Sequence, residues 1–267
     1  MTAFSRSPNP RGAYRERQSP ADSVSSSDDA PASAAQKVML MGVTNVPPSY
    51  PNRFARFLFR AMAVEMGENA LNGVLGLALG DMPIYQAYID QMPANTLDKA
   101  FAFSAVAALN QALDSYYEPR IGRGMALRVG RAWFYQGMKG FGALGGIDTP
   151  AVVKLDPTVR CRLALGALAH IFTHFSDQTA WLDESERVFR FVVDPCAMAW
   201  GVRAERPMCQ MVVGLLQECV RWASGGLDYA VRETHCRAVE GGACIFVVNK
   251  QPVPVAITTT GAASGDS

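Results

Sequence analysis

The sequence has little net charge and no long apolar segment. Its 267 residues carry 25 Lys and Arg against 24 Asp and Glu, which leaves a formal net charge of +1. Such a balance excludes an acidic activation segment and a general polyanion-binding protein, so we expect no nucleic-acid partner. The longest helix-compatible runs without charge, residues 100–113 and 163–176, are 14 residues each. Because a membrane-spanning helix needs about 20 residues, we expect no transmembrane segment.

Targeting signals are also lacking. Residues 1–36 contain eight Ser, four Pro and four Arg balanced by four acidic residues, with almost no aliphatic pattern. The first hydrophobic cluster, at residues 38–41, arrives too late for a signal peptide, and a transit peptide would be poor in acidic residues. We therefore expect a disordered tail at 1–36, one globular domain at 37–255, a second disordered tail at 256–267, and a cytoplasmic protein.

Familiar catalytic motifs are missing as well. No Gly-x-Gly-x-x-Gly follows a strand pattern, and no combination of Ser, His and Asp has a hydrolase context. The sequence therefore favours a binding module over an enzyme.

The hydrophobic pattern predicts helices first and strands later. Apolar residues at three- and four-residue steps predict helices over residues 54–66, 71–79, 95–117, 127–141, 157–175 and 207–224. The segment 120–124, with its two glycines, reads as a turn. Residues 188–193, 229–233 and 245–247 are rich in β-branched and aromatic side chains and predict strands. The expected fold class is α+β, with N-terminal helices packed on a C-terminal antiparallel sheet.

Cysteine is the residue type whose placement is most informative. Five of the six cysteines lie between residues 196 and 244, and without a secretory signal we interpret them as reduced thiols. Cys236 and Cys244 flank the Gly241-Gly242 turn of the expected hairpin, so their sulfurs can approach each other with Glu233 nearby. Cys209, at the start of the preceding helix, can supply a fourth donor. Three sulfurs and one oxygen form a donor set typical of zinc, so the expected α+β fold includes a zinc-stapled helix and β-hairpin.

These residues resemble those of the 4-vinyl-reductase domain family, which also includes hydrocarbon-binding proteins and the zinc-containing aromatic-sensor domains of bacterial transcription activators. The resemblance rests on Cys209 with Gly214, on Glu233 shortly before Cys236, on Cys236-x7-Cys244 and on Phe246. It implies an α+β fold, a homodimer and a pocket for an apolar small molecule.

Two features depart from the family pattern. The usual Gly-Asp of the C-terminal loop is replaced by Glu240-Gly241-Gly242, and Cys196 offers an additional thiol. Cys196 could therefore replace a proposed zinc ligand, and His235 is a weaker candidate because it points away from its strand neighbours. The plainer interpretation is that the cysteines are buried as small apolar side chains.

Candidate pocket residues come from the aromatic positions and the histidines. Trp133, Phe134, Phe172 and Trp222 could line an apolar pocket near the sheet, or be ordinary core. His170 and His174, four residues apart on one helical face, could contact a ligand, coordinate a chlorin magnesium or bind a metal, although packing explains such a pair more often.

Three functions remain open from the sequence. The first is a zinc-containing carrier or sensor that binds a hydrocarbon or tetrapyrrole, with the zinc structural because four ligands leave no open position. The second is an enzyme or accessory factor of bacteriochlorophyll biosynthesis that reduces the 4-vinyl group of a chlorin. The third is a transcription-regulatory ligand sensor that acts with a partner.

Overall fold

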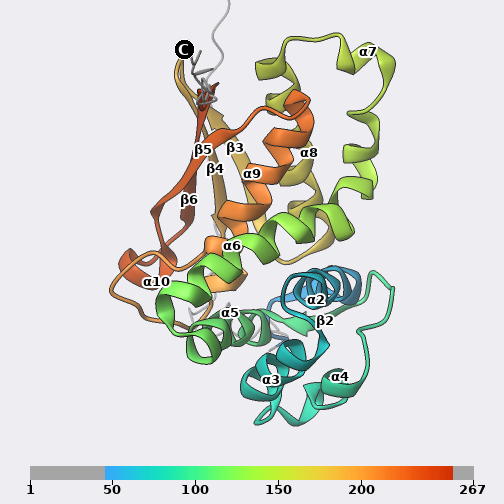
Figure 1. Cartoon of the computed structure of the whole chain (residues 1–267), viewed down its shortest axis with the longest axis vertical. Coiled ribbons are helices and arrows are strands. Elements are labelled where there is room, and N and C mark those ends of the chain that lie inside the picture. The colour runs from blue at the N-terminus through green and yellow to red at the C-terminus, as the bar shows by residue number, and fades with distance from the viewer. Residues whose placement is uncertain (1–45, 255–267) are drawn as a thin grey trace, which may run out of the picture. The chain divides into compact units, whose positions relative to one another are not determined.

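Apolar side chains at helical spacing build most of the fold. The computed structural model of the protein describes residues 46–254 (Figure 1), and the predicted tails at 1–36 and 256–267 lie outside the described residues. The described helices are α2 (Asn52–Met66), α3 (Glu68–Leu79), α4 (Ala87–Asp90), α5 (Phe103–Tyr117), α6 (Pro119–Gln136), α7 (Pro150–Val153), α8 (Pro157–Phe175), α9 (Gln210–Ser224) and α10 (Arg237–Glu240). Short 3-10 turns lie at Pro83–Tyr85, Met138–Gly140, Gly142–Gly146 and Ala197–Ala199.

The strands form two antiparallel sheets. A small one pairs β1 (Ser49–Pro51) with β2 (Lys99–Ala102). The larger has the order β3 (Thr179–Glu184), β4 (Val188–Asp194), β6 (Cys244–Pro252) and β5 (Tyr229–His235). Helices α8 and α9 pack against one face of this larger sheet (Figure 1). The predicted α+β class, with helices on a C-terminal antiparallel sheet, is confirmed.

The helix pair α6 and α9 crosses at two glycines. A Cβ atom at Gly130 of α6 would lie 1.9 Å from the Met211 carbonyl oxygen, and one at Gly214 of α9 would lie 2.0 Å from the Leu127 carbonyl oxygen. Both distances are far below van der Waals contact, so only glycine allows this approach. The crossing fixes the first turn of α9, next to Cys209.

Several predicted elements differ from the structure. Residues 120–124 are helical and belong to α6, so the predicted turn is wrong: Pro119 starts the helix, and Gly122 lets it approach the Leu113 carbonyl oxygen of α5, from which a Cβ atom would be only 2.5 Å away. The helix predicted from residue 95 begins at Phe103, because residues 99–102 pair with β1 as a strand. Helix α9 begins at Gln210 and not at Pro207.

The hairpin connection and one strand also depart from the expectation. A short helix, α10, precedes Gly241 and Gly242, so the chain reverses over the eight residues 236–243 rather than in a tight turn. Strand β3 was not predicted, and it forms one edge of the larger sheet.

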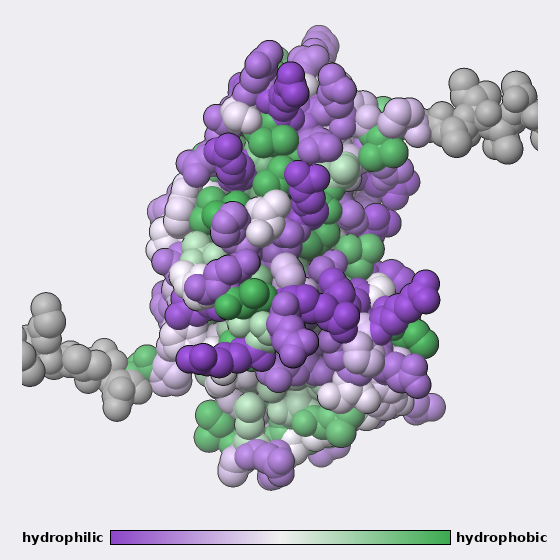
Figure 2. Space-filling view, turned by 90° about the vertical axis from the view of Figure 1, so that its left-hand side faces the viewer, coloured by the Kyte–Doolittle hydropathy of each residue, from purple (hydrophilic) through white to green (hydrophobic). Residues whose placement is uncertain are grey.

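The second face of the larger sheet carries alternating residues that point away from α8 and α9. The side of the molecule that carries the sheet shows small hydrophobic patches between hydrophilic side chains (Figure 2).

Within residues 46–254, no helix has both the length and the apolar character needed to cross a membrane.

Candidate metal centre and aromatic core

Cys209 is positioned at the N-cap of α9. Its side chain is fully buried, and its backbone N–H donates a hydrogen bond to Glu233 Oε2 at 2.9 Å. Hydrogen bonds with Cys196, Cys236 and Cys244, together with burial, raise the pKa of the Cys209 thiol well above its usual value, so this thiol would lose its proton on binding a metal. Cys209 thus ties the start of α9 to strand β5.

The hairpin supplies the other donors. Glu233 lies on β5 opposite Phe246, Cys236 follows the end of β5, and Cys244 begins β6. The Cys244 sulfur accepts a hydrogen bond from the Arg237 backbone N–H at 3.3 Å. The hydrogen bond with Cys196 and burial nevertheless raise the pKa of the Cys244 thiol, so this thiol too would lose its proton on binding a metal.

The four predicted donors come together in the structure. Ligand atoms of Cys209, Glu233, Cys236 and Cys244 all lie within 4.8 Å of one another. The Cys209 sulfur is 3.9 Å from that of Cys236 and 3.7 Å from that of Cys244. Two sulfurs bound to one tetrahedral zinc at about 2.3 Å lie about 3.8 Å apart, so the donor set could hold such an ion.

Glu233 gives an independent indication of a cation. Its Oε2 accepts from Cys209, but its Oε1 is buried and has no hydrogen-bond partner among the described residues. Burial, together with the neighbouring Cys236, raises the pKa of the Glu233 carboxyl to about 8. A buried carboxylate oxygen without a partner is costly, and a bound cation would remove that cost.

Cys196 and His235, the two alternative ligands, lie in different places. The Cys196 sulfur is buried 3.7 Å from that of Cys209, and hydrogen bonds from Cys209 and Cys244 lower the pKa of the Cys196 thiol to about 5. Cys196 does not belong to the group of four within 4.8 Å, although it contacts that group. His235 is exposed, with its ring Nδ1 3.4 Å from Thr234 Oγ1.

Asn110 is a supporting residue that the sequence analysis missed. It is buried on α5, and its side-chain amide donates to the Met198 and Met208 carbonyl oxygens at 3.4 and 3.1 Å. These two carbonyls belong to the segments that carry Cys196 and Cys209. The signal available in the sequence was a polar Asn within the uncharged, apolar run of residues 100–113.

The six predicted pocket residues fall into three places. Trp133 and Phe172 are buried with ring centroids 6.2 Å apart, in a cluster that also contains Tyr50. Phe134 instead contacts the half-buried Trp222, with centroids 5.4 Å apart. His170 and His174 are exposed on α8 with their rings stacked at 3.7 Å, and the structure does not bring them to the aromatic cluster.

The aromatic cluster adjoins the candidate metal centre through Tyr50. Burial raises the pKa of the Tyr50 hydroxyl, and the charges of the neighbouring Cys196 and Cys209 also act to raise it. The indole N–H of Trp133 is buried and has no hydrogen-bond partner among the described residues. This core therefore contains one unpaired donor inside an apolar environment.

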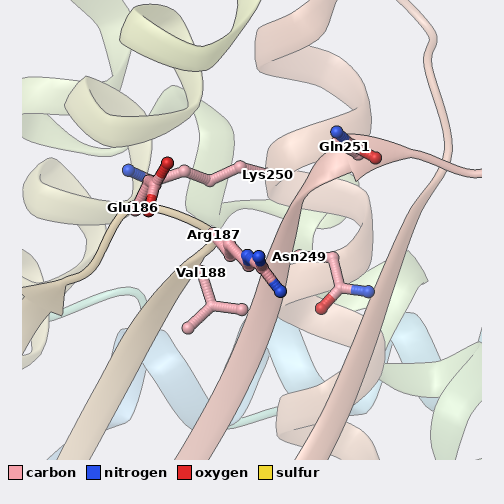
Figure 3. Close-up of a pocket in the computed structure, with 6 residues that line it drawn as sticks. All are labelled: Glu186, Arg187, Val188, Asn249, Lys250 and Gln251. Carbon is pink, nitrogen blue, oxygen red and sulfur yellow. The ribbon is translucent and has the colours of Figure 1, made fainter.

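A surface depression of about 550 Å³ lies away from this centre, at the tip of the β3–β4 hairpin and the end of β6 (Figure 3). It is lined by Glu186, Arg187, Val188, Asn249, Lys250 and Gln251. Cys244 and Asn249 are five residues apart on β6, or about 17 Å along an extended strand. The two sites are therefore separate.

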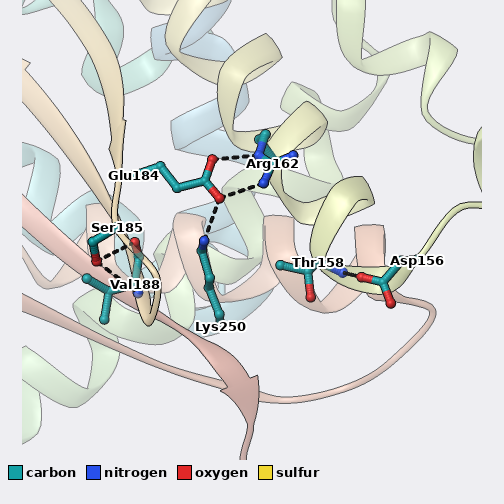
Figure 4. A network of polar contacts seen from close by, with 7 residues as sticks. All are labelled: Asp156, Thr158, Arg162, Glu184, Ser185, Val188 and Lys250. Atoms are coloured by element: carbon teal, nitrogen blue, oxygen red, sulfur yellow. Dashed lines mark hydrogen bonds and ion pairs between the residues drawn. The ribbon is translucent and has the colours of Figure 1, made fainter.

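Lys250, at the rim of this depression, takes part in an ion-pair network. Glu184 on β3 accepts two hydrogen bonds of 2.6 Å from Arg162 on α8 and also pairs with Lys250 on β6 (Figure 4). The hydrogen bonds from Arg162 and Lys250 lower the pKa of the Glu184 carboxyl to about 2. The network joins α8 to the sheet and explains the position of Lys250 without a ligand.

Comparisons with known proteins find only distant structures. No known protein-family profile and no curated protein sequence matches the chain, so the resemblance to the 4-vinyl-reductase domain stays a prediction. Among solved structures, an oxygen-binding H-NOX domain related to soluble guanylate cyclases is 10% identical, with 74% of this chain and 94% of that chain covered and a TM-score of 0.46.

An unliganded Fe(II) H-NOX protein mutant from K. algicida is 15% identical, with 75% of this chain and 96% of that chain covered and a TM-score of 0.43. With TM-scores below 0.5, this likeness is coarse and carries no information about the ligand of this chain.

Proposed function

We propose that the chain is a zinc-stabilised binding protein for an apolar small molecule, a hydrocarbon or a tetrapyrrole, which it carries or senses. The observation that carries this proposal is the group of the buried Cys209, Cys236 and Cys244 with the half-buried Glu233. Four protein ligands complete a tetrahedral zinc shell and leave no position for a substrate, which is typical of a structural site. Bound zinc would supply a cross-link between the start of α9 and the β5–β6 hairpin.

The aromatic core supports the binding part of the proposal. Ligand sites of this class are mostly apolar, with few polar groups that fix orientation. Trp133 matches this description, because its buried N–H lies among aromatic rings and lacks a partner among the described residues. A ligand with one acceptor atom would pair this N–H, and the two residues Tyr50 and Phe172 would contact its apolar part.

Titration of the purified protein with a divinyl chlorophyllide and with a polycyclic aromatic hydrocarbon tests this proposal. We expect saturable 1:1 binding of one of the two, detected by quenching of Trp fluorescence or by a shift of the chlorin absorption. The Trp133→Phe variant keeps an aromatic ring but loses the N–H donor. Its affinity for the chlorophyllide, which has acceptor oxygens, should fall about fivefold to tenfold, the value of one hydrogen bond, whereas the hydrocarbon has no acceptor and should lose no hydrogen bond. Trp181→Phe, on the other face of the sheet, is the matched control and should bind as the original chain does.

Absence of binding by both ligand types would contradict the proposal. Adding a nicotinamide cofactor separates a carrier or sensor from an enzyme, because saturating a vinyl group needs an electron source and the sequence has no dinucleotide motif. We expect binding without reaction. Conversion of the vinyl to an ethyl group by this chain alone would instead establish the vinyl reductase.

A further inference from the structure

Cys196 is the cysteine of the buried cluster that the proposed zinc shell does not use. Its side chain is fully buried, and its sulfur lies 3.7 Å from that of Cys209. The group of four donor atoms joins Cys209 to Glu233, Cys236 and Cys244 and leaves Cys196 out. A thiol outside the donor group therefore contacts a sulfur that would bind the metal.

The fold holds the segments of these two cysteines side by side. Cys196 precedes a 3-10 turn, and Cys209 precedes α9. The side-chain amide of Asn110, on α5, donates to the Met198 carbonyl oxygen of one segment and to the Met208 carbonyl oxygen of the other. A buried side chain of a third element thus maintains the contact between the two sulfurs.

The other sulfurs near Cys209 are less free to react with it. Those of Cys236 and Cys244 lie 3.9 and 3.7 Å from the Cys209 sulfur, the spacing of ligands on one tetrahedral zinc. A bound zinc would hold these three sulfurs apart. A disulfide bond needs two sulfurs at about 2.05 Å, and among the described thiols next to Cys209, Cys196 is the one that such a metal leaves free to approach.

We propose that Cys196 and Cys209 form an oxidation site, at which hydrogen peroxide joins the two sulfurs in a disulfide and so removes a ligand from the zinc shell. The inference rests on the proposed zinc shell. Peroxide first converts the Cys196 thiol to a sulfenic acid, with one peroxide oxygen kept on the sulfur and the other lost as water. The Cys209 thiolate then attacks this sulfur and expels hydroxide, which takes up a proton and becomes water. The two sulfurs together lose two electrons, peroxide gains them, and Cys209 no longer serves as a ligand.

A surface depression brings solvent close to the cluster. It has a volume of about 580 Å³, and its lining includes Ala199, Arg237 and Gly242. Ala199 is three residues after Cys196, and Arg237 directly follows Cys236. Peroxide is uncharged and only slightly larger than water, so a small opening of this lining is enough to admit it.

The two cysteines outside the cluster provide a contrast. Cys219 lies ten residues after Cys209, about 15 Å along α9. Burial raises the pKa of the Cys161 thiol to about 11 and also raises the pKa of the Cys219 thiol. Because the thiolate is the form that reacts, we expect both to stay reduced.

Addition of one equivalent of hydrogen peroxide to the reduced, zinc-loaded full chain tests the proposal. We expect the free thiols, counted after denaturation, to fall from six to four per chain, with release of zinc to a colorimetric chelator. Mass spectrometry of the digested protein should find the disulfide between Cys196 and Cys209. Dithiothreitol with added zinc should restore the starting state.

Two variants separate this disulfide from general oxidation. Cys196→Ala removes a thiol outside the donor group, so it should bind zinc as the original chain does and then keep both its five thiols and its metal under peroxide. Cys219→Ala is the matched control, since it also removes one buried thiol, and it should still lose two thiols and its zinc.

Three results would overturn the proposal. A Cys196→Ala chain without zinc would make Cys196 a ligand, zinc release without the Cys196–Cys209 disulfide would place the oxidation elsewhere, and equal release from Cys196→Ala would make Cys196 irrelevant. Each of these leaves the proposed function standing, because the original chain still holds zinc before peroxide is added. An original chain that holds no zinc at that stage would instead contradict the metal part of the proposed function, and the disulfide alone would then decide the thiol pair.

Discussion

The crossing of α6 and α9 predicts that one methyl group added at Gly130 disturbs both the fold and the metal centre. A Cβ atom at this position would be 1.9 Å from the Met211 carbonyl oxygen, and ordinary contact begins at 3.4 Å. The first turn of α9 must therefore move by about 1.5 Å in Gly130→Ala. Cys209 precedes this turn, and a metal site tolerates changes in ligand distance of only about 0.2 Å.

The magnitude follows from two opposing effects. Overpacking costs about 1–3 kcal/mol, and replacing Gly by Ala inside a helix returns about 1 kcal/mol. The net loss is therefore up to about 2 kcal/mol, which lowers the Tm of a domain of this size by up to about 8 °C. Gly124→Ala is the matched control, because Gly124 is on the same helix and has open space around its Cβ position, so its Tm should rise by about 2–4 °C.

Thermal unfolding and the zinc content of the two variants are the measurements. We expect Gly130→Ala to lose both stability and part of its metal, and Gly124→Ala to keep its metal. If Gly130→Ala is as stable as Gly124→Ala and retains the same zinc content, the reasoning about the crossing is refuted.

Two further perturbations concern the ion pairs and the supports of the centre. Because the pKa of Glu184 in the fold is about 2, below its ordinary 4.5, its pairs with Arg162 and Lys250 stabilise the fold above about pH 4.5 and are lost as the pH falls towards 2. Glu184→Gln should therefore lower the Tm at neutral pH, and its Tm difference from the original chain should vanish as the pH falls towards 2. Glu186→Gln removes no described ion pair and should leave the Tm unchanged. A Tm difference for Glu184→Gln that does not depend on pH would contradict this reasoning. Asn110→Ala leaves the Met198 and Met208 carbonyl groups without their donor. The free energy of unfolding, measured in urea, should fall by about 1–3 kcal/mol, and the zinc content should fall with it. An unchanged unfolding midpoint would show that the amide does not support the centre.

Helical periodicity predicted α2, α3, α8 and α9, because each buries a continuous apolar stripe. Strand β2 escaped prediction because its partner, β1, lies about 50 residues earlier in the sequence. Strand β3, Thr179–Glu184, escaped it because its sequence mixes polar and charged residues with few β-branched or aromatic ones, although its partner β4 follows directly. Gly122 and Gly124 suggested a turn, yet Gly122 allows the close approach of α5 and α6. Local sequence does not distinguish these two uses of glycine.

The donor group could be predicted because a hairpin brings its own two strands together, which puts Cys236 beside Cys244 whatever the rest of the chain does. The contact of Cys196 with Cys209 depends on the path of the connection between β4 and α9, which no local pattern specifies. The same holds for the aromatic residues: neighbours in sequence such as Trp133 and Phe134 point to different parts of the core.

The zinc content of the protein purified without chelator tests the central claim most directly. We expect about one zinc per chain in the original protein and in Cys161→Ser, whose sulfur lies outside the donor group and hydrogen-bonds the Val220 carbonyl oxygen. Cys236→Ser and Cys244→Ser should each lose the metal and unfold at a lower temperature, because metal binding is coupled to folding. A wild-type protein without zinc, or a Cys236→Ser protein that keeps a full complement, would contradict the account.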